Sequence, residues 1–250
     1  MQTGKVAIVT GSGRGIGAAT AKLLAANGYA VCISYKADEE SAVSIEHSIR
    51  QMGGRCISVK ADVSSENEVR ELFERVDEEL GALSCLVNNV GILAKQCRLE
   101  DMSTARIEKI FKTNVTSYFM CSQQALKRMS KQRGGSGGAI INVSSLASIT
   151  GSPNEYIDYA SSKGAIDTFT RGLAVEVAAE GVRVNCVRPG LIYTDIHSDG
   201  GEPGRVERLK TKIPMQRGGK PEEVAEAVLW LASEKSSFVT GAFIDLSGGL

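Results

Sequence analysis

Short apolar runs alternate with longer amphipathic stretches along this chain, and no other feature of the sequence constrains its fold more. The amphipathic stretches predict helices at residues 16–27, 39–52, 66–80, 104–132, 157–180 and 221–233. The apolar runs predict strands at residues 5–10, 30–35, 55–61, 83–88, 139–144, 182–187 and 242–246. Strands of almost continuous Val and Ile that alternate with helices are typical of a parallel sheet covered on both faces. We therefore expect an α/β fold with a seven-stranded parallel sheet in three layers.

The composition argues against several classes of function. The formal net charge is zero, so long-range attraction to nucleic acid or anionic lipid is not expected. No apolar run approaches the ~20 residues that span a bilayer. The first predicted strand begins at Lys5, which leaves no visible signal peptide. We therefore expect a cytoplasmic protein with no nucleic-acid or membrane partner, and one domain over residues 1–250 because no linker divides the chain.

The cysteines and histidines predict no metal site. None of the six cysteines lies in a C-x-x-C pair, and several fall in apolar runs, so buried reduced thiols are expected. His47 and His197 have no ligand spacing around them, and we expect both at the surface. The cysteines are Cys32, Cys56, Cys85, Cys97, Cys121 and Cys186.

A glycine-rich segment, Thr10–Gly17, follows the first predicted strand and opens the first predicted helix. Glycines let a backbone turn tightly and approach a pyrophosphate, and the helix N-terminus presents free N–H groups to the anion. A plain strand-to-helix turn is the alternative, but the strand before the turn and the helix after it favour a dinucleotide site.

The second predicted strand indicates which dinucleotide is bound. NAD sites usually place an acid at the end of this strand, but here it reads Ser34-Tyr35-Lys36. Asp38 and its acidic neighbours come later and suit the start of the next helix. Arg14 and Lys36 are placed to reach a 2′-phosphate, unless they are only solvated surface charges. We therefore predict NADP(H) in preference to NAD(H), while NAD(H) remains a possible cofactor.

Tyr159 and Lys163 lie four residues apart, so they share one face of a predicted helix. An ammonium beside a phenol stabilises the phenolate and is expected to lower its pKa from a starting value near ~10. Such a phenol can exchange a proton with a carbonyl or alcohol oxygen. The pair Ser144-Ser145 ends a predicted strand shortly upstream and offers a hydroxyl for the same oxygen.

Seven motifs follow one another along the chain: Thr10–Gly17, Asp62-Val63, Asn88–Gly91, Asn114, Ser144-Ser145, Tyr159 with Lys163, and Pro189-Gly190 followed by Thr194. Taken in order, these motifs resemble the short-chain dehydrogenase/reductase family in its form of about 250 residues, over essentially the whole chain. Within the family the chain is similar to the bacterial branch of glucose dehydrogenase-like and 3-oxoacyl-carrier-protein reductase-like members. The resemblance implies a Rossmann-type doubly wound sheet and a homotetramer in which helices 104–132 and 157–180 pair between subunits.

The resemblance also implies roles for individual residues. Asn114, Ser145, Tyr159 and Lys163 would form the catalytic tetrad, with Asn114 holding a water that links Lys163 to solvent. Asn88 would lie along the adenosine ribose, and Asn89 would tie neighbouring strands together. The predicted cofactor-binding residues are Gly11, Arg14, Gly15, Ile16, Gly17, Ser34, Tyr35, Lys36, Asp62, Val63, Asn89, Val90, Gly91, Asn114, Tyr159, Lys163, Pro189, Gly190, Ile192 and Thr194.

Two positions depart from the family pattern. Val90 stands where the family usually has Ala, which narrows the space beside the cofactor. The gap from Ser145 to Tyr159 is one residue longer than usual, so the extra residue falls in loop 146–156 and leaves Ser144 as an alternative to Ser145. Ser145 is preferred because it lies three residues after Asn142, as the family serine does.

The remaining questions concern substrate and activity. Residues 191–216 form a long irregular stretch, which we interpret as a substrate lid because long loops in compact domains are usually functional or mobile. The expected substrate is a small carbonyl or alcohol such as a sugar, a 3-oxoacyl thioester or a ketone. A basic cluster near the end of a predicted helix has two interpretations: it is a solvated helix end, or it meets an acidic carrier protein. The cluster is Lys127, Arg128, Lys131 and Arg133. A non-catalytic NADP-binding module for redox sensing or scaffolding is the alternative to an oxidoreductase.

Overall fold

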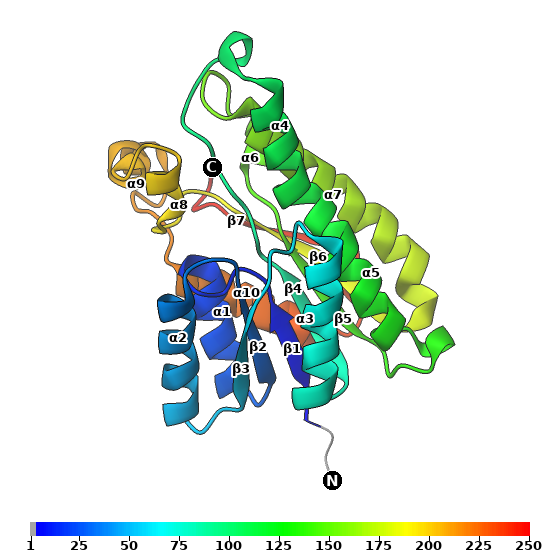
Figure 1. Cartoon of the computed structure of the whole chain (residues 1–250). Helices are drawn as coiled ribbons and strands as arrows, with labels where there is room; N and C mark the ends of the chain where they lie inside the picture. The colour runs from blue at the N-terminus through cyan, green and yellow to red at the C-terminus, as the bar shows by residue number, and fades with distance from the viewer. Residues whose placement is uncertain (1–3) are drawn as a thin grey trace.

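The computed structural model describes residues 4–250, and its seven strands form one sheet in the order β3-β2-β1-β4-β5-β6-β7 (Figure 1). Every neighbouring pair is parallel. The strand order reverses between β1 and β4, which makes the sheet doubly wound and opens a crevice at the carboxyl ends of these strands. The strands are β1 (Val6–Val9), β2 (Ala30–Tyr35), β3 (Cys56–Lys60), β4 (Leu83–Asn88), β5 (Gly138–Val143), β6 (Val182–Pro189) and β7 (Phe243–Leu246).

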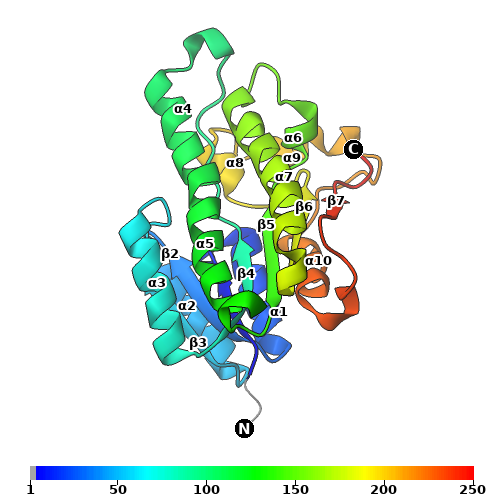
Figure 2. The same ribbon diagram turned by 90° about the vertical axis from the view of Figure 1, so that its right-hand side faces the viewer.

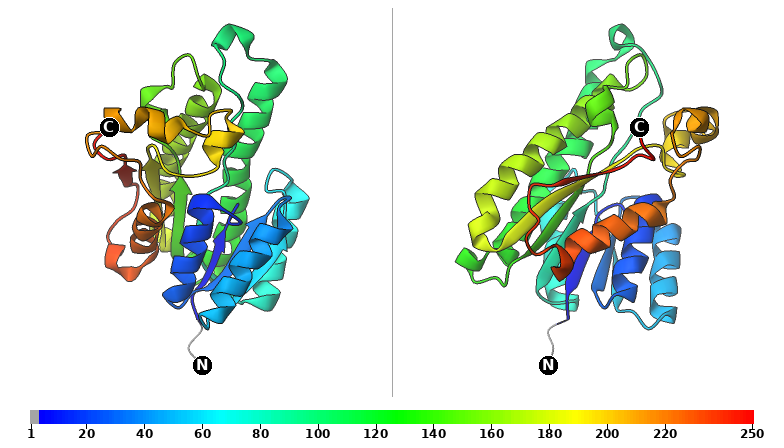
Figure 3. Two further views of the ribbon diagram at one scale, coloured as in Figure 1. Left: turned by 90° about the vertical axis from the view of Figure 1, so that its left-hand side faces the viewer. Right: turned by 180° about the vertical axis from the view of Figure 1, so that it is seen from behind.

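Helices cover both faces of the sheet, as Figures 2 and 3 show from opposite sides. One face carries α1, α2 and α10, and the other carries α3, α5 and α7. The predicted three-layer Rossmann-type fold is therefore confirmed. The helices are α1 (Gly15–Ala26), α2 (Glu39–Gln51), α3 (Glu66–Glu79), α4 (Thr104–Phe111), α5 (Ser117–Met129), α6 (Ala147–Thr150), α7 (Ile157–Val177), α8 (Ile196–Asp199), α9 (Arg205–Leu209) and α10 (Pro221–Ala232).

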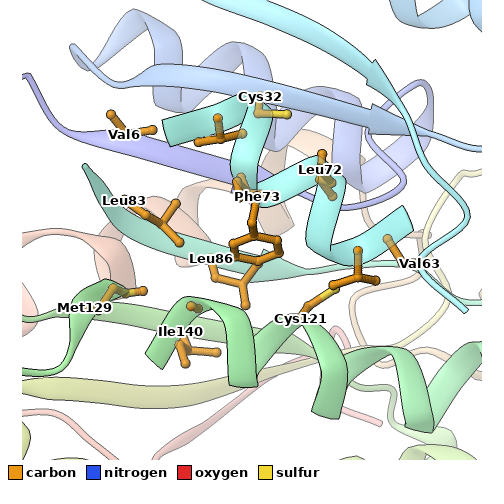
Figure 4. Close-up of a cluster of buried hydrophobic side chains, with 14 of the residues drawn as sticks. Val6, Cys32, Val63, Leu72, Phe73, Leu83, Leu86, Cys121, Met129 and Ile140 are labelled. Carbon is orange, nitrogen blue, oxygen red and sulfur yellow. The ribbon is translucent and has the colours of Figure 1, made fainter. Parts of the chain in front are cut away.

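Alternate side chains of β1 pack into the two hydrophobic cores on opposite faces of the sheet. Val6 and Ile8 pack into the core beneath α3, α5 and α7, whereas Ala7 and Val9 pack into the core beneath α1, α2 and α10. Successive side chains of a strand point to opposite faces, so a strand with helices on both sides must be apolar throughout. Figure 4 shows the first core, where the Phe73 ring of α3 lies over Leu86 of β4.

The helix predicted at 104–132 is not one regular helix. The chain runs from α4 into α5 through a π-helical turn at Lys112–Thr116, and the two helices form a continuous rod (Figure 2). Asn114 lies in this turn and is fully buried. A π-turn inserts one extra residue and is frequent at functional sites. The helix predicted at 104–132 is therefore present over 104–129, but the sequence did not indicate its π-turn, because the apolar pattern on either side hides a single inserted residue.

Segment 191–216 is better ordered than the irregular stretch expected from the sequence. It contains α8, α9 and a 3-10 turn at Lys210–Lys212. This segment lies beside the C-terminal residues (Figures 1 and 3), where the Met215 N–H donates to the Gly248 carbonyl at 3.1 Å.

The structure also tests the predictions for cysteine and histidine. All six cysteines are free thiols, and all but Cys97 are buried. His47 is exposed as predicted, but His197 is 8% exposed and its Nε2 lies 2.9 Å from the Ile192 carbonyl oxygen. The surface prediction for His197 was therefore wrong, because α8 turns this ring inward. In the described part of the chain, no helix is long and apolar enough to cross a membrane.

Candidate active site

A cavity of about 690 Å³ lies at the carboxyl ends of the strands, where the strand order reverses. It runs from the glycine-rich turn to α6, α8 and α9. Of the residues predicted to bind cofactor or act in catalysis, all but Asn88 and Asn114 line it. Those that do are Gly11, Arg14, Gly15, Ile16, Gly17, Ser34, Tyr35, Lys36, Asp62, Val63, Asn89, Val90, Gly91, Ser145, Tyr159, Lys163, Pro189, Gly190, Ile192 and Thr194.

The glycine-rich turn leaves no room for side chains at two positions. Gly11 has a φ of +63°, in the left-handed region that favours glycine. A Cβ on Gly17 would lie 2.6 Å from both the Asn89 Nδ2 atom and the Gly11 carbonyl oxygen. The turn therefore keeps its backbone open toward the cavity at the N-terminus of α1, which is the arrangement that a pyrophosphate requires.

Asn89 fixes this turn against the end of β4. Its Nδ2 donates to the carbonyl oxygens of Thr10 and Gly11 at 2.9 and 3.1 Å. The Thr10 hydroxyl accepts from the N–H groups of Asn89 and Val90 at 2.9 and 3.2 Å. These bonds confirm that Asn89 ties neighbouring strands together. A Cβ on Gly11 would lie 2.9 Å from the Val90 Cγ2 atom, so the valine does narrow this part of the cavity.

Asn88 does not face the cavity. Its side chain is 1% exposed and donates to Ser122 and to the Asn142 Oδ1 atom at 3.2 and 3.0 Å. The prediction that it lies along the adenosine ribose was wrong, because it is the next residue, Asn89, whose side chain lies beside the glycine turn.

The end of β2 carries a polar group that is ready for a ligand. The Ser34 hydroxyl is buried and has no hydrogen-bond partner within residues 4–250, although Ser34 lines the cavity. A buried hydroxyl without a partner costs free energy, which a ligand would recover. Together with the glycine turn, this orphan hydroxyl fits a dinucleotide.

Both cations predicted to select the cofactor are paired with carboxylates. Lys36 lies 2.6 Å from Asp62, and Arg14 pairs with Asp199 of α8. The cationic side chains of both pairs are more than half exposed. Asp38 instead accepts from the Ser41 N–H at 3.0 Å and caps α2, as the sequence predicted. The positive charge at this end of the cavity is therefore partly neutralised by the protein itself.

Lys163 of α7 is 2% exposed, and its Nζ donates to the Val143 carbonyl at 2.8 Å and to the Tyr118 hydroxyl at 3.3 Å. Burial lowers the pKa of Lys163 from 10.5 to about 8. The ammonium nitrogen lies 5.7 Å from the centre of the Tyr159 ring. The two side chains thus share one helix face, as the spacing predicted, but Lys163 makes its hydrogen bonds elsewhere.

Tyr159 has the opposite pKa shift to the one predicted. Burial raises its pKa to about 12, and the nearby Ser145 hydroxyl opposes this rise. The expected lowering of the Tyr159 pKa was wrong for the chain by itself. Desolvation of the phenolate outweighs the attraction of the Lys163 ammonium, because this ammonium donates its hydrogen bonds to other acceptors. At neutral pH the Tyr159 phenol is therefore protonated.

The two neighbouring serines have different surroundings. The Ser144 hydroxyl is buried and donates to the Lys163 carbonyl at 3.1 Å, which holds α7 against the end of β5. The Ser145 hydroxyl accepts from the Ala147 N–H at 3.1 Å, donates to the Pro189 carbonyl at 3.5 Å, and lowers the pKa of the nearby Tyr159 phenol. Ser145 is thus the serine whose hydroxyl meets the tyrosine at the cavity.

Asn114 braces the site from behind. Its Oδ1 accepts from the Ile92 N–H at 2.9 Å, and its Nδ2 donates to the Ile92 carbonyl and the Ser162 hydroxyl, both at 3.1 Å. These bonds join the π-turn to the loop after β4 and to α7. Because Asn114 is fully buried and does not line the cavity, it reaches the site through these neighbours.

The sequence missed the residues that hold segment 191–216 over the cavity. The Tyr156 hydroxyl donates to the Gly200 carbonyl at 3.1 Å. Arg205 pairs with Glu155 and, at 3.0 Å, with Glu202. In the sequence, only the three-residue spacing of Glu202 and Arg205 indicates one of these ion pairs. The pair with Glu155 is not indicated, because Glu155 lies 50 residues away from Arg205.

Comparison with known proteins places this geometry in a family. The family model described as Enoyl-(Acyl carrier protein) reductase matches residues 11–250. The chain is 57% identical to the uncharacterized oxidoreductase YgfF of Escherichia coli over 244 residues, which cover 98% of this chain and 99% of that one. It is 39% identical to glucose 1-dehydrogenase 2 of Bacillus subtilis over 249 residues, which cover 99% and 95%.

A solved structure agrees. A short-chain dehydrogenase from Burkholderia cenocepacia, in complex with NADP, superposes with a TM-score of 0.88 at 32% identity, covering 98% of this chain and 97% of that one. The chain therefore belongs to the short-chain dehydrogenase/reductase family. It is an NAD(P)-dependent oxidoreductase.

Proposed function

We propose that this chain is an NADP-dependent oxidoreductase that interconverts a carbonyl and an alcohol, with Tyr159 as the general acid and base. One observation carries the proposal. Tyr159 lines the cavity together with Ser145, on the same helix face as the buried Lys163 ammonium and beyond a turn shaped for a pyrophosphate. These groups can hold a substrate oxygen and supply it with a proton.

The residues divide the proton chemistry among them. Bound nicotinamide supplies or accepts the hydride, and the protein supplies geometry and charge. In the reducing direction the Tyr159 phenol, with its pKa at about 12, is protonated at neutral pH and donates to the substrate oxygen. Ser145 donates a hydrogen bond to that oxygen. Lys163, with its pKa at about 8, is mainly charged at pH 7 and stabilises the phenolate that forms.

The preference for NADP rests on charge. β2 ends in Ser34-Tyr35 and is followed by Lys36, without an acid, and Arg14 and Lys36 both line the cavity. The structurally similar Burkholderia chain is in complex with NADP. A hydrogen bond to a charged group contributes about 1.5–3 kcal/mol, which is about tenfold or more in affinity. Fluorescence titration should therefore give a lower Kd for NADPH than for NADH, and equal values would refute the preference.

Three further properties belong to this proposal. Segment 191–216 acts as a substrate lid, because Tyr156 and Arg205 hold it over the cavity.

The chain forms a cytoplasmic homotetramer through α5 and α7, where Phe119 is 44% exposed and its ring lies 4.2 Å from that of Phe169. Light scattering should give four times the mass of 26.5 kDa, and a monomeric mass would contradict this assembly.

The test is NADPH oxidation against a panel of carbonyls that includes a 3-oxoacyl thioester, diketones, aldehydes and keto sugars. Tyr159→Phe should lower turnover by about 10²–10⁴-fold, as expected for loss of a general acid, while the Kd for NADPH changes little. Near-normal turnover in this variant would refute the assignment of Tyr159. NADPH binding without turnover of any panel member would favour a non-catalytic binding module.

A further inference from the structure

Tyr118 of α5 places a hydroxyl group deep inside the protein, directly behind the catalytic candidates. Its side chain is 1% exposed. The hydroxyl donates to the Val143 carbonyl at 2.9 Å and accepts from the Lys163 Nζ at 3.3 Å. A buried hydroxyl is costly unless it is hydrogen-bonded, and here its two partners are the end of β5 and the ammonium itself.

The ammonium is enclosed by this arrangement. Lys163 Nζ lies 5.3 Å from the centre of the Tyr118 ring and 5.7 Å from that of Tyr159. Of its three N–H donors, one goes to Val143 and one to Tyr118. The third has no acceptor within residues 4–250, and Lys163 lines the cavity. Gly91 keeps space open there, because a Cβ on this glycine would lie 3.3 Å from the Nζ atom.

We propose that Tyr118 is a positioning residue for the reaction, which holds the Lys163 ammonium by its hydroxyl and stabilises the charged form. The proposal rests on the function proposed above, since it assigns Tyr118 a role through Lys163. The contact joins α5 to α7. Its two residues lie 45 positions apart in the sequence, so Tyr118 is outside the motif formed by Tyr159 and Lys163.

The groups that face Lys163 determine the sign of the expected effect. Asp167 of α7 and Cys186 of β6 raise the pKa of Lys163, but burial is the larger effect and lowers it to about 8. Asp167 also accepts from Ser148 at 2.7 Å and lies 3.4 Å from Arg188.

Tyr118 itself stays neutral. Burial holds the pKa of the Tyr118 phenol well above its usual value, with Tyr159, Cys186 and Cys121 acting in the same direction. Its oxygen is therefore a neutral acceptor that favours the ammonium over the amine. Removing that oxygen should lower the pKa of Lys163 further, so the charged form is lost at a lower pH.

The experiment is Tyr118→Phe, which keeps the ring and removes one oxygen. The pH dependence of kcat for carbonyl reduction should show its basic limb displaced downward by about one pH unit, since one unit corresponds to a modest charge-assisted hydrogen bond. Tyr118→Met is a second variant without the hydroxyl, and it should shift the limb in the same direction.

Tyr29→Phe is the matched control. Tyr29 is also buried, and its hydroxyl donates to a backbone carbonyl, that of Ala232, at 3.0 Å, but it lies in the core on the other face of the sheet. Both Phe variants lose one buried hydroxyl, so their melting temperatures should fall similarly. Only the Tyr118 variant should shift the pH profile. Superimposable profiles for the two variants would overturn the proposal.

A second readout does not depend on turnover. The pH dependence of Lys163 acetylation by acetic anhydride, followed by mass spectrometry, reports the pKa of this amine in the folded protein. In Tyr118→Phe its midpoint should move down by about one unit, and an unchanged midpoint would overturn the proposal. If Tyr159→Phe remained active while the acetylation midpoint still moved, the proposed function would fail but the contact between Tyr118 and Lys163 would stand.

Discussion

The two ends of the cavity are held in place by different kinds of interaction. The glycine end, formed by Gly11–Gly17 with Asn89, is held by backbone geometry and by hydrogen bonds to main-chain atoms. The lid end, formed by residues 146–156 and 191–216, is held mainly by charged side chains: Arg205 with Glu155, and both Arg205 and Arg208 with Glu202. Backbone geometry tolerates almost no substitution, whereas ion pairs between loops can be replaced one at a time.

This difference separates the binding of a dinucleotide from the binding of a substrate within a single chain. A dinucleotide presents the same pyrophosphate to every protein that binds it, so one rigid turn is sufficient. Substrates differ, and the loops around them can vary without disturbing the sheet. The hydrogen bonds from Arg208 hold the pKa of Glu202 at about 2, so this carboxylate stays ionised throughout the physiological range.

Gly17→Ala should produce the largest effect at the glycine end. The new Cβ would lie 2.6 Å from both Asn89 and the Gly11 carbonyl, so the turn must shift. We expect the Kd for NADPH to rise by about tenfold or more, as overpacking costs about 1–3 kcal/mol. Gly13→Ala is the control in the same turn, because its Cβ would meet no atom closer than 3.7 Å. Equal losses in the two variants would show that the turn is uniformly fragile.

The sequence predicted the glycine end well and the lid end poorly, for a physical reason. The role of Gly11 follows from the local backbone conformation between one strand and one helix, and strand and helix patterns are themselves local. The pairing of Arg205 with Glu155 depends on where two distant loops meet. The same holds for the contact of Lys163 with Tyr118, which no spacing along the chain indicates.

Two of the failures inside the site have the same origin. The helical pattern gave no sign of the π-turn at Asn114, because one inserted residue leaves the flanking apolar periodicity intact. The pKa of Tyr159 was predicted with the wrong sign because spacing shows that Lys163 is near but does not show how deeply either group is buried. Burial and hydrogen-bond direction are properties of the packed structure, and they decide the electrostatics of this site.

An intermediate effect is expected at the lid end from Arg205→Gln. This guanidinium is 12% exposed and contacts Glu155, Glu202 and the Tyr156 ring. Truncating one partner of a buried charge pair is costly, and we expect kcat/KM to fall by about tenfold with the Kd for NADPH unchanged. The segment should also become more sensitive to proteolysis.

Arg208→Gln is the matched control for this change. Arg208 pairs with the same two carboxylates as Arg205, but its side chain is 52% exposed. Exposed pairs contribute about 0.2–1 kcal/mol, so the loss in kcat/KM should be about twofold. If both variants lost the same activity, burial would not be what distinguishes the two arginines, and the lid end would depend on net charge alone.

The smallest effect is expected where the two ends meet, at the pair of Arg14 with Asp199. Both side chains are about half exposed, at 55% and 45%. Asp199→Asn should free the guanidinium for a 2′-phosphate and lower the Kd for NADPH by about twofold, with no change for NADH and with the gain lost at high salt. Asp195→Asn, which removes an exposed carboxylate from the same segment, is the control. A gain in NADPH affinity that is confined to Asp199→Asn would show that the lid end competes with the cofactor for Arg14. Equal gains in affinity for the two variants would show only the effect of removing negative charge near the phosphate.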